Sequence, residues 1–324
     1  MPQEKKGSGI STLLEVVREL EKERDSRIWC MVHRGRGHIC GPTMYALYSG
    51  RDGIGKGKKV ELLLHSPGGH PQIAYKAMKF FRSRFKEVNV IVPLLAKSSA
   101  TLMCLGADRI FMGELAELGP IDIQIDDPVI HGEKSFSPID EFKSIEFMRE
   151  QAIEWIQFYA VVMHREYGMS IKEALKDSVP LVSGLMRPLF EQIEPLEMGG
   201  NRRSLAIAEE YANRMLELSG NENARSIVRQ FVWEYPSHDF CIDFEEAKKH
   251  GLPVERLTET QDRRLTKAII QLGKEDSYHG FPPPPSSRAT KRGKVHKAGA
   301  QPKNPTRGRV NGHDNRGPEE RVQA

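Results

Sequence analysis

Two short segments of this chain combine residue types that carry out nucleophilic chemistry in proteins. The first reads Ser66-Pro67-Gly68-Gly69, the second reads Lys97-Ser98-Ser99, and each directly follows an apolar run. A serine that opens a helix lies near the positive end of the helix dipole. Backbone N–H groups of the Gly68-Gly69 turn, together with the N–H after the serine, can converge on one oxygen and stabilise its developing charge. That layout is an oxyanion hole beside a nucleophile.

A purely structural interpretation of the same residues stays open. Serine is a common N-cap, so Ser98 can simply begin a helix. Glycine pairs are common in turns, so Gly68-Gly69 can be a turn without a catalytic role. Pattern alone does not separate the two interpretations.

The surrounding elements determine whether the two segments meet. Apolar runs at 60–64 and 88–95 are typical of buried strands, and the segment 71–85 has apolar residues at helical spacing. Another apolar helical run covers 102–107. Strand, turn, helix, strand, turn and helix in this order predict a βαβα unit with parallel strands. Both turns then lie at the carboxyl ends of the strands, on the edge where open α/β sheets bind ligands.

Four strings in the chain carry a resemblance to a known superfamily. HSPGG at 65–69, AKSSAT at 96–101, GADRIFMG at 106–113 and LGPID at 118–122 together resemble the Clp protease/crotonase superfamily. Within it, the chain is most similar to the serine dehydrogenase proteinase family, which is related to signal peptide peptidase A. The resemblance implies an α/β fold, a Clp protease/crotonase-like spiral of repeated ββα units with flanking helices. It also implies a serine-type peptidase that hydrolyses peptide bonds in peptide or protein substrates.

The resemblance also assigns roles to individual residues. It makes Ser98, rather than Ser99, the counterpart of the nucleophile. The oxyanion hole then consists of the Gly68-Gly69 turn, with the Gly69 N–H as donor, and of the Ser99 N–H.

The general base is left unassigned by the resemblance. Clp-type proteases supply a histidine after the nucleophile, but the matching position here falls near Asp122, and no histidine occurs between Ser98 and His131. Asp122 is a candidate that positions another group or acts as the base itself. His238, in the string PSHDF, matches a His-Asp pair of the family and is the other candidate base.

Two other functions remain open at this point. The missing histidine at the Clp position is compatible with a catalytically inactive binding scaffold that keeps the crotonase fold. An acyl-CoA-type crotonase enzyme would use the same oxyanion hole without a nucleophile, but the chain shows no pair of glutamates suited to that chemistry.

Composition limits the cellular setting and the cofactors. The four cysteines are widely spread, without zinc spacing or a disulfide pattern, which favours a reducing cytoplasm. No apolar run is long enough to span a membrane, so we expect a cytoplasmic protein. Nothing in the sequence predicts a metal site or another cofactor.

Charge and pattern divide the chain into three parts. We predict a flexible N-terminus at 1–10, a Clp/crotonase-like peptidase domain at 11–274 and a disordered basic tail at 275–324. From Phe281 onward there are ten Lys and Arg against three Asp and Glu, although the whole chain has a formal charge of only +4. Such a tail can contact nucleic acid weakly through phosphate charge.

The region after Pro138 predicts association between copies of the chain. Apolar residues recur every three or four positions from Ile145 to Met163, on a face wide enough to bury against a second subunit as well as the core. The superfamily forms rings and trimers through such helices, so the resemblance implies a homo-oligomer.

Overall fold

The computed structural model describes residues 8–121, 137–273 and 276–283. Its main sheet has six strands in the order β7-β5-β3-β2-β1-β8, and every neighbouring pair is parallel except β1 and β8. The strands span Arg27–His33 (β1), Gly57–His65 (β2), Phe85–Val92 (β3), Arg109–Met112 (β5), Val254–Arg256 (β7) and Ser277–Gly280 (β8).

A small second sheet continues the long strands. Its strands β4 (Leu95–Ala96) and β6 (Glu117–Leu118) pair in parallel. Single bridges extend this sheet on both sides, from Ser66 to Ala96 and from Leu118 to Ile242. A long strand therefore leads into a short extended piece of the second sheet and then into a helix. This repeat confirms the predicted α/β fold of ββα units.

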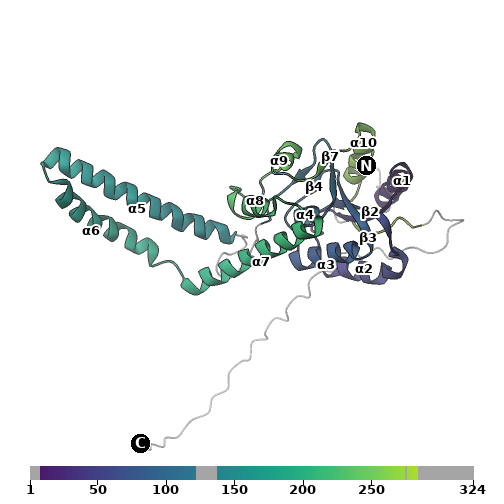
Figure 1. Ribbon diagram of the computed structural model, residues 1–324, viewed down its shortest axis with the longest axis horizontal. Helices are drawn as coiled ribbons and strands as arrows, with labels where there is room; N and C mark the ends of the chain where they lie inside the picture. Colours follow the sequence, from purple (N-terminus) through teal and green to yellow (C-terminus); the bar gives the residue numbers. More distant parts are fainter. Residues whose placement is uncertain (1–7, 122–136, 274–275, 284–324) are drawn as a thin grey trace, which may run out of the picture.

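Helices cover both faces of the main sheet (Figure 1). Strand β1 shows how the two faces are divided, because Trp29 and Met31 belong to one buried cluster and Ile28, Cys30 and Val32 to the other. The first cluster packs under α2 (Gly41–Ile54), α3 (Pro71–Arg82), α4 (Ser99–Leu105) and α7 (Pro195–Ser219). The second packs under α1 (Ser8–Glu23) and α10 (Glu259–Ile270). Because both faces are buried, the central strands read as continuous apolar runs.

A helical hairpin extends away from this α/β body. Helix α5 (Pro138–Tyr167) begins at the N-cap Ser137, whose hydroxyl accepts the Ile139 N–H at 3.3 Å. It lies antiparallel to α6 (Ile171–Phe190), and α7 returns the chain to the body (Figure 1). We call α5 and α6 the arm. Three shorter helices complete the body: α8 (Ala224–Arg229), the π-helical turn Gln230–Glu234 and α9 (Phe244–Lys249).

Glycines do not end two helices of this protein, and the N-terminal boundary differs from the prediction. Helix α2 continues through Gly50 and Gly53 to Ile54, because Leu47 and Ile54 are both buried, seven positions apart on one face. Gly199-Gly200 does not interrupt α7, which runs from Pro195 through both glycines. Helix α1 begins at Ser8, inside the segment expected to be flexible.

The boundary of the basic tail is also wrong. The segment 276–283 belongs to the body, since β8 pairs with the edge of β1, and Phe281 packs edge-on against Trp29 with ring centroids 5.0 Å apart. An unpaired sheet edge accepts a strand regardless of the low apolar content of that strand. The remaining tail, 284–324, lies outside the described residues.

Within the described ranges, no helix is both long and apolar enough to cross a lipid bilayer.

Candidate active site

The site is built around the Gly68-Gly69 turn at the carboxyl end of β2. Both glycines have positive φ, +115° and +136°, which residues with a side chain rarely adopt. Only glycine can therefore occupy these two positions without backbone strain. The turn lies between the loop at Ile39 on one side and Ser98 on the other.

Ile39 holds the turn through its backbone. Its N–H donates to the Gly68 carbonyl at 2.7 Å, and its own carbonyl accepts the His70 N–H at 2.9 Å. A Cβ added to Gly69 would collide with the Ile39 carbonyl oxygen. This close approach fixes the direction in which the Gly69 amide points.

Ser98 contacts the other side of the turn. A Cβ built on Gly68 would lie 2.8 Å from the Ser98 Cβ and 3.3 Å from its Oγ. The structure therefore brings the two segments together, as the βαβα prediction requires. Their contact is so close that a side chain at position 68 would displace the serine.

The Ser98 backbone is strained. With φ 49° and ψ −119°, it is one of two non-glycine residues with positive φ among those described. Such a conformation costs on the order of 1–3 kcal/mol and persists only where the surroundings enforce it. Ser98 occupies the N-cap position of α4, yet its side chain makes no capping hydrogen bond. Ser98 therefore begins α4 without capping it through its side chain, and nucleophilic serines are also found at strained strand-to-helix turns.

Bonds on both sides of Ser98 hold this conformation. The Lys97 N–H donates to the Ser66 carbonyl at 3.0 Å, which ties the serine segment to the end of β2. The Lys97 ammonium donates to the Phe240 carbonyl at 3.0 Å and pairs with Glu117 at 3.2 Å. Lys97 is thus a structural residue that anchors the chain beside the serine.

Two backbone amides near the serine are available to a ligand. The Ser99 hydroxyl donates to the Gly69 carbonyl at 2.5 Å, which couples the glycine turn to the start of α4. Within the described part of the chain, neither the Gly69 N–H nor the Ser99 N–H has a hydrogen-bond partner. The Gly68 N–H differs, because it donates to the Ser66 hydroxyl at 3.2 Å. Gly68 therefore contributes to the turn through its missing side chain, because its N–H is already engaged.

The two candidate bases have different positions. Asp122 lies outside the described residues. His238 is half-buried, in a segment whose Asp239 and Phe240 carbonyls accept hydrogen bonds from the Lys97 ammonium, at 3.4 and 3.0 Å. Among the described residues no side chain is hydrogen-bonded to the Ser98 hydroxyl.

The other histidines near the strand ends are interior groups. His65, which precedes the turn, is buried, and burial lowers its pKa to about 4. His33 is equally buried, and burial followed by the nearby His279 lowers its pKa to about 3. Both are neutral at physiological pH and unsuited to a charge-bearing role there.

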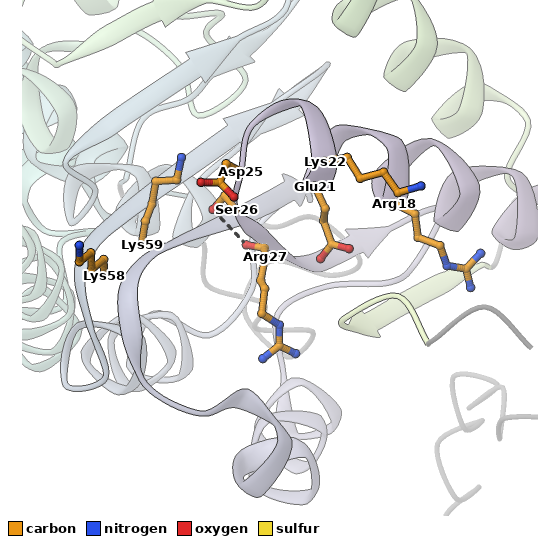
Figure 2. Close-up of a pocket in the computed structure, with 8 residues that line it drawn as sticks. All are labelled: Arg18, Glu21, Lys22, Asp25, Ser26, Arg27, Lys58 and Lys59. Carbon is orange, nitrogen blue, oxygen red and sulfur yellow. Dashed lines mark hydrogen bonds between the residues drawn. The ribbon is translucent and has the colours of Figure 1, made fainter.

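A surface hollow of about 740 Å³ lies at the opposite end of the strands, where β1 and β2 begin (Figure 2). Its lining includes Arg27 at the start of β1 and Lys58 and Lys59 at the start of β2. Strands of seven to nine residues separate it from Ser66 by roughly 20–30 Å. Two of its cations already bind backbone carbonyls, Lys59 that of Arg24 and Arg27 that of Gly53. The hollow is therefore separate from the serine site.

The sequence interpretation missed the contribution of Ile39 and its loop. The segment 34–40, which the sequence analysis did not assign to the site, pairs through its backbone with the glycine turn. The sequence contains one feature that links this loop to the site. The three segments that meet there, 26–51, 62–86 and 88–107, all lack Asp and Glu.

The ββα repeat, with its strained serine facing a glycine turn, defines a ClpP-like α/β protein. A family model described as "ClpP-like SDH-type serine proteinase" matches residues 1–131, which contain the glycine turn and Ser98. The uncharacterized protein MJ0137 of Methanocaldococcus jannaschii is 34% identical over 252 residues, which are 75% of this chain and 73% of that protein. The chain belongs to this family of ClpP-like serine proteinases.

More distant similarities were also found. The uncharacterized protein MJ1495 of the same organism is 28% identical over 126 residues, covering 36% of this chain and 43% of its own length. A mutant of the membrane-bound stomatin-specific protease 1510-N has 14% identity and a TM-score of 0.40, with 74% of this chain and 84% of that chain covered. A mutant of ClpP1 from Listeria monocytogenes has 16% identity and a TM-score of 0.24, with 49% and 83% covered.

The contact between Gly68 and Ser98 generates a testable prediction. We expect Gly68→Ala to lower the free energy of unfolding by about 1–3 kcal/mol, because the new Cβ requires strained backbone and lies 2.8 Å from the Ser98 Cβ. Urea denaturation followed by circular dichroism measures the change.

Gly53→Ala is the matched control for this substitution. Gly53 lies in α2 with no atom within 4 Å of an added Cβ, so the alanine should raise stability by about 0.5–1 kcal/mol. Equal stabilities of the Gly68→Ala and Gly53→Ala variants would contradict the tight packing at the turn.

Proposed function

We propose that the protein is a serine peptidase in which the Ser98 hydroxyl attacks the scissile carbonyl. The base takes the serine proton, and the Gly69 and Ser99 N–H groups stabilise the oxyanion of the tetrahedral intermediate. The C–N bond then breaks as the base passes that proton to the leaving amine, and water hydrolyses the resulting acyl-enzyme to release the acid and restore the hydroxyl. The observation that carries the proposal is the strained Ser98 backbone in contact with Gly68. A serine with only a structural role has no need of that conformation.

His238 is the general base in this proposal. The match of PSHDF to the His-Asp pair of the family supports it, and the Asp239 and Phe240 carbonyls next to His238 bind the ammonium of Lys97, the residue before Ser98. Asp122 remains a candidate base or positioning group on sequence grounds alone.

Two competing functions are weaker. A crotonase-type acyl-CoA enzyme needs a pair of glutamates near the acyl group, and the sequence shows no pair suited to that chemistry. An inactive scaffold is favoured by one observation, since no described side chain is hydrogen-bonded to the Ser98 hydroxyl. Bases often align only when substrate is bound, so that observation does not exclude catalysis.

Covalent labelling tests the nucleophile. A fluorophosphonate probe should label the wild-type protein and the Ser83→Ala variant, whose exposed serine lies outside the site, but not Ser98→Ala. Intact-mass spectrometry measures one adduct, and peptide mapping places it. Labelling of a folded Ser98→Ala protein, or no labelling of the folded wild type, would favour the scaffold.

Substitution of the histidine tests the base. We expect His238→Ala to slow phosphonylation of Ser98 by about 100-fold or more, because proton transfer by a positioned base contributes about that much. His164→Ala, on the arm, should react at the wild-type rate. Stopped-flow fluorescence at several pH values measures the rate. If His238→Ala were phosphonylated as fast as the wild type, another group would have to be the base.

The arm supports a second part of the proposal, a homo-oligomer. Helices α5 and α6 meet through a narrow seam that includes the small residues Ala160, Ala174 and Ser178. Many large apolar side chains remain 37–76% exposed on the arm: Phe147, Ile153, Trp155, Phe158, Val161, Tyr167, Ile171, Leu175, Val179, Leu181, Leu185, Leu189 and Phe190. Apolar surface of this extent marks an interaction site. We infer that a second copy of the chain covers it.

Charge on the arm should dissociate the oligomer. We expect Leu181→Glu/Leu185→Glu to convert the protein to monomers, because burying two carboxylates at an apolar contact is strongly unfavourable. The control Lys172→Gln/Lys176→Gln changes the net charge equally at exposed polar positions of the same helix. Sedimentation velocity gives the mass. A wild-type monomer at micromolar concentration would refute the oligomer.

A further inference from the structure

The candidate site lies in a cationic part of the chain. The three segments that meet there, 26–51, 62–86 and 88–107, contain no Asp or Glu, although 44 such residues occur in the whole sequence. The first segment includes the loop 34–40, which carries Arg34, Arg36 and His38. We call it the basic loop.

Backbone hydrogen bonds fix the basic loop against the glycine turn. Ile39 lies within the loop and bonds to Gly68 and to His70, at 2.7 and 2.9 Å. On the opposite side of the same turn, Gly68 contacts Ser98. The basic loop and the candidate nucleophile therefore lie on opposite sides of a two-residue turn.

The cations of the loop are unpaired. Within the described ranges, neither Arg34 nor Arg36 forms an ion pair or a side-chain hydrogen bond. Arg36 and His38 are exposed, and the His38 ring lies 6.0 Å from the exposed ring of His70. Elsewhere on the body, Arg24 binds the buried Glu61 at 2.7 Å and Arg82 binds Asp108 at 2.7 Å. Arg24 and Arg82 thus have acidic partners, and among the described residues the two arginines in the loop have none.

The opposite flank of the serine has a different charge. There the Lys97 ammonium is neutralised by Glu117, and Asp239 lies close by in the segment that Lys97 contacts. On the Ile39 side, Asp276 accepts the Arg34 N–H through its backbone carbonyl at 3.0 Å, but its carboxylate accepts the Gly273 N–H at 2.8 Å and pairs with neither loop arginine. The field of Arg34 also reaches the strand end, where it adds to the lowering of the pKa of His65.

We propose that the basic loop selects peptides with an acidic side chain beside the scissile bond, through contacts of Arg34 and Arg36 with that carboxylate. A guanidinium binds a carboxylate through two parallel hydrogen bonds, which gives both attraction and orientation. The inference rests on the proposed peptidase function and specifies its substrate class.

Matched peptides test the selectivity. An internally quenched peptide that the full-length protein cleaves, acetylated and amidated at its ends, is prepared with Asp, Asn or Lys at each position flanking the cleaved bond. We expect kcat/KM for the best Asp peptide to exceed that of its Asn counterpart about fivefold or more at low salt, and the Lys peptide to be slowest. The advantage should shrink as ionic strength rises.

Variants assign the effect to the loop. In Arg34→Gln/Arg36→Gln the Asp-to-Asn ratio should fall close to one, whereas kcat/KM for the Asn peptide should stay within about twofold of wild type. Lys56→Gln/Lys58→Gln removes the same charge at the far end of the sheet and should keep the wild-type ratio.

The outcomes separate this inference from the proposed function. Ser98-dependent cleavage with no preference for Asp, or a preference that survives Arg34→Gln/Arg36→Gln, would overturn the inference alone. Absence of fluorophosphonate labelling and of any Ser98-dependent cleavage would overturn the peptidase function and the inference together.

Discussion

The contact between two backbone turns is the constraint on which the site depends. Gly68 and Ser98 are separated by thirty positions in the chain, yet no side chain fits between them. Parallel pairing of β2 with β3 brings the two carboxyl ends to one edge, and the Ser66–Ala96 bridge continues the pairing to the serine itself. A change of register between these strands would displace the amides from the hydroxyl.

The strain at Ser98 is maintained by the body of the protein. Helix α4 behind the serine is buried along its whole length, so it cannot shift to relieve the backbone. Thr101 adds a further connection, since its hydroxyl donates to the Ala96 carbonyl at 2.6 Å and accepts the Gly119 N–H at 3.0 Å. Rigid packing of this kind lets a reactive conformation persist at a cost of on the order of 1–3 kcal/mol.

The arm and the basic loop, to which the two proposals assign contacts, differ in their surface chemistry. The arm has large apolar side chains on its outside and small residues between its helices, the reverse of what an isolated hairpin in water would favour. The basic loop instead exposes charge beside the glycine turn. Apolar area favours a permanent subunit contact, and charge favours a transient and selective one.

The core of the site was predictable because its determinants are local. Apolar runs, glycine turns and Pro71 at the first position of α3 each act over a few residues, so the order of strands, turns and helices follows from pattern. Long-range effects account for the errors. Strand β8 forms because it pairs with β1, although it lies in a segment of low apolar content. Helix α2 continues through Gly50 and Gly53 because Leu47 and Ile54 are buried in the core.

By itself, the sequence determined the α/β class, the family resemblance and the candidate nucleophile, because all three depend on residue types at short spacing. Only the tertiary structure decided the strained Ser98 backbone, the engagement of the Gly68 N–H by Ser66, and the place of the basic loop beside the turn. Each of these depends on contacts between segments that are far apart in the chain and come together where the strands end. The local sequence pattern carries no information about such contacts.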